Sequence, residues 1–513
     1  MIHIFLTTTI AMLTVLAGGM ALTGLSVAIA GDFHDAMVLL GCAGVGGVGY
    51  MAQRRWSNSA PSTNLAVNSA AVAIGWFVSS IYATFPIWII ALISGAAESD
   101  TNRTMIAHQS FLNAWYDGTA SITSGGLTST LRSSELTPAI QLWRSVGQWI
   151  GGIGMAVVAT RLIASNQQSW TMYRGETRQW TAGSLDSILR RIVVSYLLLT
   201  AACGGMFWIV GMPTWESINH GLIIVSTGGL TVVDDSFASY SWGLQAIACL
   251  FMLLGAASFS AIHVGMTGKW RALFHRSDVR AYVTLAVLGV VTLAVLSWTS
   301  SDSTIWQVWF NGASAMTTCG VSSGLVSRET EAIQLCFVTL MLIGGCSDST
   351  AGGLKVNRVL WLFKVLRTEL RRGIHPDRRA ILPRWDRRSL SEASFHASTH
   401  HCIVILLLGL LTFLSGVLVL RLSYSQNVDL MQILFQSASA SSTVGLSMDL
   451  IGPDRPAVAK TAEIFLMISG RLEWMAVVLI PFVFGNRASG EQCKLTLAGA
   501  DVSSEVSFGD DRV

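Results

Sequence analysis

Long runs of apolar residues, separated by short polar segments, extend along almost the whole chain. Ten of these runs have about the 20 residues that a helix needs to cross the hydrocarbon core of a bilayer. They cover residues 4–30, 36–51, 65–93, 139–164, 192–210, 242–264, 281–298, a broken run within 332–365, 402–420 and 464–483. The pattern predicts an all-α protein that crosses a membrane repeatedly.

The composition argues against a water-soluble protein of this size. Of the 513 residues, 51% are hydrophobic and 12% are charged, and the mean hydropathy is +0.54. Soluble domains contain about 25% charged residues. The net charge of +3 does not indicate a nucleic-acid partner. The eight cysteines include no Cys-x-x-Cys pair, so we expect neither a disulfide framework nor a transition-metal site.

Positive charge is concentrated in alternate loops. Since loops rich in Lys and Arg stay in the cytoplasm, these loops and both chain termini are predicted to be cytoplasmic. The basic loops contain Arg54, Arg55, Arg161, Arg174, Arg178, Lys269, Arg271, Arg276 and the run from Arg367 to Arg388. The Ala28-Ile29-Ala30 segment resembles a signal-peptidase site, but no Lys or Arg precedes the first apolar run, which favours an uncleaved helix.

A five-residue pattern recurs in four of the outer loops. Each copy reads hydroxyl, hydroxyl, variable, glycine, apolar, and each follows a half-apolar segment that is too short to span. The copies are Thr123-Ser124-Gly125-Gly126-Leu127, Ser226-Thr227-Gly228-Gly229-Leu230, Thr317-Thr318-Cys319-Gly320-Val321 and Ser442-Thr443-Val444-Gly445-Leu446. Nine residues before the fourth-position glycines lie Asp117, His220, Asn311 and Gln436, which we call the polar column. One copy would be an ordinary turn, but four aligned copies predict a repeat of helix, short re-entrant helix, extended loop and helix.

Four such loops predict a ring of backbone carbonyl groups around one central pore. Non-helical backbone at membrane depth is tolerated only where it is buried in protein or lines a water-filled cavity. Glycine adopts positive φ, which turns successive carbonyl oxygens toward one axis, where they replace the hydration shell of a cation. The first four residues of each copy, which we call the filter loops, are therefore the predicted selectivity filter. The fourth copy is also close to the Thr-Val-Gly core of potassium-channel filters.

A second candidate site interrupts the apolar run within 332–365. The backbone of this Gly-, Ser- and Thr-rich stretch cannot face lipid unpaired, which predicts a flexible gate that faces the pore, with a simple helix kink as the alternative. Burial of Arg471 costs at least ~2.5–3.5 kcal/mol, so we expect it to face the pore as a barrier to cations, with Glu473 or Asp348 offsetting part of its field. The alternative is a structural ion pair with no role in permeation. Lys355 either joins Arg471 or reaches the membrane surface. The candidate gate residues are Gly344, Gly345, Cys346, Ser347, Asp348, Ser349, Thr350, Ala351, Gly352, Gly353, Lys355 and Arg471.

Other polar residues favour simpler interpretations. We expect Glu216 to cap the second short helix, and Asp234 and Asp235 either to concentrate cations at the pore mouth or to be solvated. The basic linker of residues 371–392 fixes the topology, contacts anionic lipids or docks a cytoplasmic partner. The histidines for which we expect no metal or switching role are His220, His396, His400 and His401.

These motifs resemble the TrkH-like membrane subunit of the bacterial Trk/Ktr potassium-uptake family. The resemblance rests on Ser217-Ile218-Asn219-His220, on the segment from Gly344 to Lys355, and on Gly470-Arg471-Leu472-Glu473. It implies a single-chain pore of four pseudo-symmetric repeats, a homodimer with one pore per subunit, a cytoplasmic nucleotide-binding Trk regulatory protein as partner, and the bacterial inner membrane as location. This sequence departs from the family pattern at Cys319, where Thr is usual, and at Asp348, where Gly is usual.

The resemblance also bears on the transported ion. Glycine at the fourth position of all four filter loops is similar to the potassium-selective pattern, whereas related sodium-favouring transporters often have Ser in the first loop. Gly126 occupies that position here. We therefore expect channel-like K⁺ uptake driven by the membrane potential, with K⁺ as the transported ion and no bound cofactor. The alternative is a Na⁺-permeable or Na⁺/H⁺-coupled transporter of the same architecture.

The repeats divide the chain into seven predicted segments. These are a two-helix extension at 1–60, pore repeats at 61–170, 171–277, 278–372 and 396–488, a basic cytoplasmic linker at 373–395 and a cytoplasmic tail at 489–513. All four repeats run in the same direction, which argues against a secondary transporter built on inverted repeats. No Walker, His-Glu-x-x-His or Gly-x-Ser-x-Gly motif occurs, so we expect no enzymatic activity.

Overall fold

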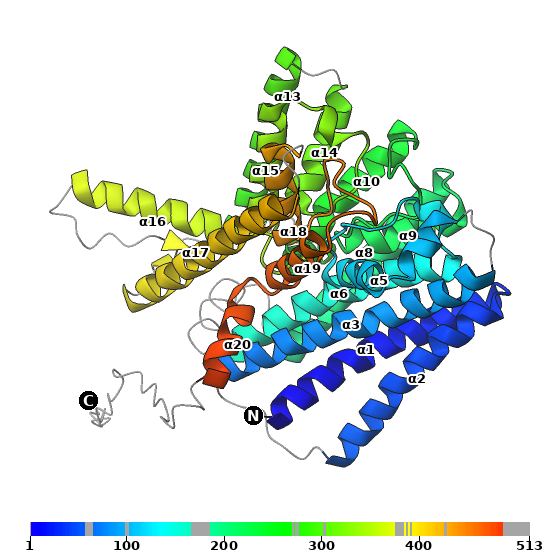
Figure 1. Ribbon diagram of the computed structural model, residues 1–513. Coiled ribbons are helices and arrows are strands. Elements are labelled where there is room, and N and C mark those ends of the chain that lie inside the picture. Colours follow the sequence, from blue (N-terminus) through cyan, green and yellow to red (C-terminus); the bar gives the residue numbers. More distant parts are fainter. Residues whose placement is uncertain are drawn as a thin grey trace.

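The protein is a bundle of long apolar helices (Figure 1). The computed structural model describes residues 2–56, 65–97, 102–165, 185–268, 271, 276–300, 304–374, 384–385, 388–389, 392–424 and 428–485. Six straight helices in these ranges are long and apolar enough to cross a membrane, or eight spans if each of two bent helix pairs counts as one. The other two predicted spans correspond to one long helix, α6, and to an interrupted pair, α15 and α16. The predicted all-α polytopic membrane protein is thus confirmed.

After an N-terminal hairpin, the helices form four groups of the same order: a long helix, a short helix, a loop and a second long helix. The hairpin is α1 (Ile2–Ile29) and α2 (Phe33–Trp56), and the first group is α3 (Leu65–Ala97), α4 (Arg103–His108), α5 (Phe111–Thr123) and α6 (Pro138–Ser165). The second group is α8 (Leu185–Ile209), α9 (Thr214–Val225), α10 (Trp242–Gly255) and α11 (Phe259–Met266). The third is α13 (Ser277–Ser300), α14 (Ile305–Thr317), α15 (Glu331–Ile343) and α16 (Val356–Ile374), and the fourth is α17 (Glu392–Ser423), α18 (Leu430–Ser441), α19 (Ala457–Arg471) and α20 (Met475–Gly485).

Minor elements lie in the connections between these helices. The 3₁₀ turns η1 (Ser133–Glu135) and η2 (Val326–Arg328) follow the first and third filter loops, and the two-residue strands β1 (Arg384–Trp385) and β2 (Arg388–Ser389) pair antiparallel. Several parts of the predicted cytoplasmic face lie outside the described residues. These are Arg174, Arg178, Lys269, most of the linker 373–395 and the tail 489–513.

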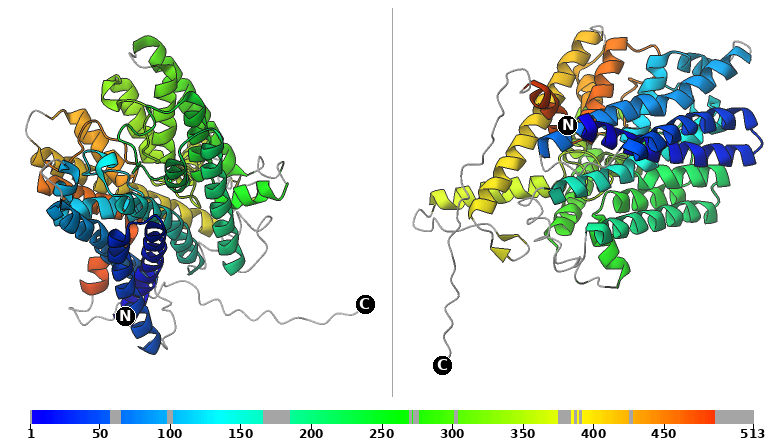
Figure 2. Two further views of the ribbon diagram at one scale, coloured as in Figure 1. Left: turned by 90° about the vertical axis from the view of Figure 1, so that its right-hand side faces the viewer. Right: turned by 90° about the horizontal axis from the view of Figure 1, so that it is seen from below.

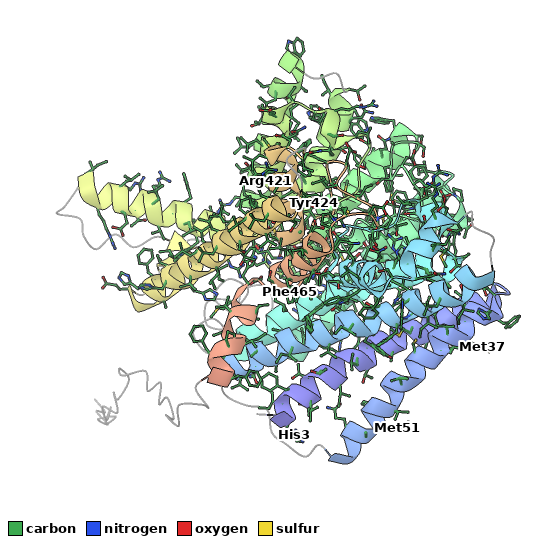
Figure 3. The ribbon with its side chains drawn as sticks, viewed as in Figure 1. His3, Met37, Met51, Arg421, Tyr424 and Phe465 are labelled. Atoms are coloured by element: carbon green, nitrogen blue, oxygen red, sulfur yellow. The ribbon has the colours of Figure 1, made fainter. Side chains whose placement is uncertain are left out.

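The N-terminal hairpin packs on the first group through close helix contacts. A Cβ atom on Gly46 would lie 2.6 Å from both the Ala17 Cβ and the Tyr82 hydroxyl oxygen, so only glycine permits this approach. The opposite side of α2 carries exposed apolar side chains, among them Met37 and Met51 at the edge of the molecule (Figure 3). An apolar exposed face of this kind suits contact with lipid.

The four short helices connect the groups into a closed ring. Each packs against the two long helices of its own group and against the second long helix of the preceding group: α9 with α6, α14 with α10, α18 with α15 and α5 with α19. The last of these contacts joins the fourth group to the first. The groups therefore surround one axis, and Figure 2 shows the first in blue to cyan, the second and third in green and the fourth in orange on different sides of the molecule.

Two predicted spans are bent rather than straight. The run 242–264 divides into α10 and α11, whose axes differ by 108°, and the run 464–483 divides into α19 and α20, whose axes differ by 98°. Ser258 forms the first bend because its side chain accepts a hydrogen bond from the first turn of α11. Glu473 and Trp474 form the second at φ values of 55° and 59°. Hydropathy reports how apolar a run is and not the direction of its axis, so the sequence analysis did not indicate either bend.

Candidate functional site

All four short helices end in the same backbone motif. The residue at the second filter position is left-handed and its N–H donates to the carbonyl oxygen three residues back, while the next N–H donates to the carbonyl oxygen five residues back. These two bonds define the Schellman motif. The φ values are 53°, 52°, 55° and 52° at Ser124, Thr227, Thr318 and Thr443. The longer-range bonds measure 2.9, 2.9, 3.0 and 2.9 Å from the N–H groups of Gly125, Gly228, Cys319 and Val444.

A residue with a Cβ atom is unusual at the left-handed position of this motif. Glycine is the ordinary choice there, because the conformation costs other L-residues about 1 kcal/mol. Here a serine or threonine occupies the position in all four loops, and all four are almost fully buried. Backbone strain that recurs at equivalent positions points to a functional requirement. We infer that the hydroxyl group, and not the turn, determines the residue at this position.

The four fourth-position glycines lie against one another. A Cβ atom on Gly126 would lie 2.8 Å from the Cα of Gly445 and 3.0 Å from the Cα of Gly229. One on Gly320 would lie 2.9 Å from the Cα of Gly445, and one on Gly229 would lie 3.1 Å from the Cys319 carbonyl oxygen. The filter loops thus meet in a closed circuit of backbone, which we call the ring. The structure brings together the four segments that the sequence predicted for the filter.

Three of the four side chains at the first filter position bond back into the short helices, whereas the buried Ser442 Oγ has no hydrogen-bond partner among the described residues. The hydroxyl groups of Thr123, Ser226 and Thr317 donate to carbonyl oxygens of α5, α9 and α14 at 2.7, 2.9 and 2.7 Å. At the third position, the buried Cys319 Sγ lies 3.6 Å from the Gly228 carbonyl oxygen of the neighbouring loop. These contacts tie the filter loops to the short helices and to one another.

The segment from Gly344 to Lys355, which we call the intramembrane loop, packs directly against the filter loops. The Gly352 N–H donates to Thr318 Oγ1 at 2.7 Å. Thr227 Oγ1 donates to Thr350 Oγ1 at 3.2 Å. The second-position hydroxyl groups of two filter loops are therefore engaged by the intramembrane loop, which lies across the predicted cytoplasmic side of the ring.

Asp348 fastens the intramembrane loop to the bend between α10 and α11. Its Oδ2 accepts hydrogen bonds from Ser258 Oγ at 2.9 Å and from the Ser260 N–H at 3.0 Å. The Arg276 guanidinium donates to the hydroxyl groups of both serines, Ser258 at 3.2 Å and Ser260 at 3.1 Å. The Cys346 N–H donates to the backbone of the bend at 2.9 Å. A carboxylate suits this position because the N–H groups in the first turn of a helix lack intrahelical partners.

Arg471 fastens the same loop from the fourth group. Its two terminal nitrogens donate to the carbonyl oxygens of Thr350 at 2.8 Å and of Gly151 at 2.7 Å. Glu473, which the sequence offered as a partner, pairs with Arg358 instead. Within the described part of the chain Arg471 has no carboxylate partner. The structural ion pair considered for it is therefore wrong, and its charge is solvated by backbone dipoles.

Lys355 and His220 are buried and have local partners. Lys355 Nζ donates to the Ala351 carbonyl oxygen at the end of the intramembrane loop, so it does not extend to the membrane surface. His220 Nδ1 bonds to the Glu216 carbonyl oxygen at 2.8 Å, and its ring packs on Phe237. No group of three metal-ligating side chains occurs within the ranges that the structure describes.

The acidic residues near the second filter loop have structural partners. The Glu216 carboxylate accepts a hydrogen bond from the Tyr240 hydroxyl at 2.6 Å. Asp234 accepts from the N–H and hydroxyl of Ser134 at 2.9 and 2.7 Å, which joins the loops of the first two groups. Asp235 accepts from a nearby serine hydroxyl. We expected Asp234 either to concentrate cations or to be solvated. Neither expectation included its hydrogen bonds to Ser134.

Gln148 on α6 supports the ring, but the sequence analysis did not identify it. Its Oε1 accepts a hydrogen bond from the Leu230 N–H at 3.1 Å, and a Cβ atom on Gly228 would collide with it. A buried network was missed as well: Glu463 on α19 accepts hydrogen bonds from Arg455 and from Tyr116 on α5. Polar residues within apolar runs are the signal that would have indicated both, because such residues need partners in lipid.

A bundle of apolar helices with four re-entrant loops that meet at one axis defines a polytopic membrane protein of the pore-loop class. The sequence profile of the TrkH family, described as cation transport protein, matches residues 63–484, most of the chain. The chain therefore belongs to the TrkH family of cation transport proteins, whose members are transporters and not enzymes.

Individual relatives and one solved structure support this assignment. The potassium uptake protein TrkI of Halomonas elongata is 27% identical over 427 residues, 79% of this chain and 81% of that protein. An uncharacterised cation transporter of Methanocaldococcus jannaschii is 26% identical over 412 residues, 80% of this chain and 81% of that protein. The crystal structure of the potassium transporter TrkH from Vibrio parahaemolyticus covers 94% of this chain and 98% of its own, with a TM-score of 0.77 and 22% identity. This likeness confirms the fold.

Proposed function

We propose that the chain conducts K⁺ into the cell through the ring of filter loops. One observation carries the proposal: four identical helix ends direct four glycine-containing loops into a single closed circuit of backbone. Carbonyl oxygens in such a circuit replace the hydration water of a cation and offer nothing comparable to an anion. The relatives named for potassium uptake or transport support K⁺ as the ion.

The membrane potential supplies the driving force in this proposal. An inside-negative potential contributes about 2.3 kcal/mol per elementary charge for each 100 mV. The chain then needs no hydrolytic site and no bound cofactor of its own. Ions pass singly through the ring in the direction of the predicted cytoplasmic face.

The intramembrane loop acts as the gate. Its limbs turn at Gly344 and Gly353, whose φ values are 73° and 76°, conformations that glycine adopts without strain. In the closed state Thr350 and Gly352 engage the filter hydroxyl groups, and Arg471 holds the loop and places positive charge beside the ion path. Opening requires that these hydrogen bonds break together, which suits a two-state gate.

The chain acts as a homodimer in the bacterial inner membrane, surrounded by lipid, with both termini in the cytoplasm. Support for a second copy comes from α16, which extends away from the bundle (Figure 1). One face of this helix carries four exposed apolar side chains spaced three or four residues apart, Phe363, Leu366, Leu370 and Ile374. A cytoplasmic nucleotide-binding Trk regulatory protein binds the cytoplasmic face and controls the gate.

Rubidium uptake into vesicles that contain the purified chain tests the proposed function. We expect K⁺ to suppress the uptake of radioactive rubidium at concentrations where Na⁺ does not, and uptake to follow an imposed inside-negative potential. Equal competition by Na⁺ would favour the Na⁺-permeable alternative. Uptake that follows a proton gradient and ignores voltage would favour the coupled alternative. Vesicles without protein control for leakage.

A further inference from the structure

Polar residues on the short helices bond to the chain just beyond the ring in three of the four filter loops. Each pair consists of a polar-column residue and the residue one helical turn before it, so both lie on one face of the helix. The pairs are Asn113 with Asp117 on α5, Gln307 with Asn311 on α14, and Gln432 with Gln436 on α18. We propose that these pairs, the filter clamps, are positioning residues that set the dimensions of the ring and hence its preference between K⁺ and Na⁺, an inference that rests on the proposed function.

In the third filter loop, the clamp binds both the backbone N–H and the backbone carbonyl group of Ser323. Asn311 Oδ1 accepts a hydrogen bond from the Ser323 N–H at 3.0 Å, 12 residues along the chain. Gln307 Nε2 donates to the Ser323 carbonyl oxygen at 3.4 Å. Asn311 and Ser323 are almost fully buried. A buried backbone group that loses its partner is costly, so Ser323 is held at a fixed distance beyond Gly320.

The fourth filter loop has the same arrangement with longer side chains. Gln436 Oε1 accepts a hydrogen bond from Ser447 Oγ at 2.8 Å. One turn earlier, Gln432 Nε2 donates to the Met448 carbonyl oxygen at 3.1 Å. Gln432 is itself fixed, because it completes a capping box with Asp429 at the start of α18. Two consecutive residues beyond Gly445 are therefore tied to α18.

The first filter loop is held by a charged clamp. Asp117 accepts hydrogen bonds from the Ser129 N–H at 2.8 Å and from Thr130 Oγ1 at 2.7 Å. Asn113 contributes its main chain to this clamp: Ser129 Oγ donates to its backbone carbonyl oxygen at 3.0 Å, while its side chain bonds to Ala107 and Lys460. The carboxylate of Asp117 is fully buried, and the guanidinium of Arg144 lies 3.8 Å away. Hydrogen bonds to a charged acceptor are stronger than neutral ones, so this is the tightest of the clamps.

The second filter loop lacks the clamp and has a substitute. His220 and Glu216 occupy the equivalent positions, but His220 Nδ1 bonds to the Glu216 carbonyl oxygen and the Glu216 carboxylate bonds to Tyr240. His220 Nε2 has no hydrogen-bond partner among the residues that the structure describes. This loop is held by Gln148 instead, through the Leu230 N–H. Only three of the four filter loops therefore have a clamp. The effect of the clamps can thus be measured separately from the effect of the helix-and-loop repeat, which all four share.

The clamps affect selectivity because they fix the filter loops on the side that the Schellman motif does not reach. Each helix end fixes the residues before the ring glycine, and the clamp fixes residues two to four positions after it. A filter loop that is held at one end only can move closer to a smaller ion such as Na⁺, which weakens the preference for K⁺. Releasing one clamp forfeits about 1 kcal/mol of restraint, which corresponds to about a fivefold change in the relative competition of K⁺ and Na⁺.

The clamp on the fourth filter loop offers the cleanest test because both partners are side chains. Gln436→Leu and Ser447→Ala each remove the same hydrogen bond, and Ser447→Ala removes little else. We expect each to lower the ratio of K⁺ to Na⁺ competition for rubidium uptake about fivefold, and the double variant to lower it no further. Ser447→Thr keeps the hydroxyl donor and should keep the wild-type ratio. Gln436 Nε2 also donates to Glu463 Oε2 at 3.3 Å, so the Ser447 variants isolate the clamp best.

Gln334→Leu is the matched control, because Gln334 is another buried glutamine that bonds a backbone carbonyl of an outer loop, at Glu329, away from the ring. An unchanged ratio in folded Gln436→Leu and Ser447→Ala variants overturns the clamp proposal, as does an equal change in Gln334→Leu. Gly126→Ser distinguishes failure of the clamp proposal from failure of the proposed function. If Gly126→Ser changes the ratio of K⁺ to Na⁺ competition while the clamp variants do not, only the clamp proposal is wrong. If Gly126→Ser has no effect either, the ring is not the filter and the proposed function fails.

Discussion

The ring and the intramembrane loop touch one another but are held by different kinds of interaction. Each filter loop starts from two backbone hydrogen bonds within its own short helix, and this arrangement occurs four times. The two limbs of the intramembrane loop are joined by backbone hydrogen bonds, from the N–H groups of Leu354 and Lys355 to the carbonyl oxygens of Leu342 and Ile343, both at 2.9 Å. Its middle part depends on groups from elsewhere, above all Ser258, Thr318 and Arg471. An element held by its own backbone keeps its shape when its neighbours shift, whereas one held by its neighbours can be released by them.

This difference indicates how each region responds to substitution. The ring has no space for added atoms, since Cβ atoms on its glycines would collide with backbone. The intramembrane loop is packed as tightly, since a Cβ atom on Gly352 would collide with the Ser442 carbonyl oxygen, but side chains that a substitution can truncate fasten it to its neighbours. Enlarging a ring residue should therefore reduce transport or change its ion preference, and truncating a loop contact should increase transport.

Gly320→Ala should have the largest effect. The new Cβ would collide with the Val444 carbonyl oxygen at a φ of 84°, and overpacking of this kind costs about 1–3 kcal/mol or more. We expect rubidium uptake into vesicles to fall about 100-fold. Gly49→Ala on α2 is the control, because a Cβ there meets nothing within 4 Å. Near-normal uptake by a folded Gly320→Ala variant would contradict a ring of fixed dimensions.

Arg471→Ala should have the opposite effect. It removes the two hydrogen bonds to Thr350 and Gly151 and the positive charge beside the ion path. Hydrogen bonds from a charged donor contribute about 1.5–3 kcal/mol each, so we expect uptake per molecule of protein to rise about tenfold.

Arg471→Lys separates the two causes, because it keeps the charge and loses the planar fork. Uptake close to wild type in Arg471→Lys would assign the barrier to charge, and raised uptake would assign it to the hydrogen bonds. Unchanged uptake in a folded Arg471→Ala variant would mean that Arg471 has no part in the gate.

Asp348→Gly should raise uptake less, about fivefold. It releases the loop from Ser258 and Ser260 but leaves the Cys346 N–H bonded to the bend and Arg471 bonded to Thr350. Asp348→Asn is the conservative control, because its amide oxygen can still accept both bonds. Equal uptake by Asp348→Gly and wild type would show that the α10–α11 bend does not restrain the loop.

The sequence predicted the ring better than the loop contacts for the same physical reason. Hydropathy and the repeated glycines report on backbone elements, and the ring is made by backbone, so its segments were found with correct positions. The partners of Arg471 and Asp348 are carbonyl and hydroxyl groups from distant segments, which no local pattern marks. The clamps lay between these cases: Asp117, Asn311 and Gln436 were aligned as polar, but polarity alone did not reveal that they bond to the chain beyond the ring.

The smallest effect concerns the left-handed serine of the first filter loop, and it tests why the ring tolerates strain. Ser124→Gly and Ser124→Ala both remove the hydroxyl group, which donates a long hydrogen bond of 3.4 Å to the Gln148 carbonyl oxygen. They differ in the Cβ atom, which costs about 1 kcal/mol at a φ of 53°. Ser124→Gly should therefore resist thermal unfolding better than Ser124→Ala, as measured by a fluorescence melting assay in detergent. If the hydroxyl group is needed at the ring, both variants should lose K⁺ preference to the same extent despite their different stabilities. Wild-type preference in both would mean that the hydroxyl is dispensable in this loop.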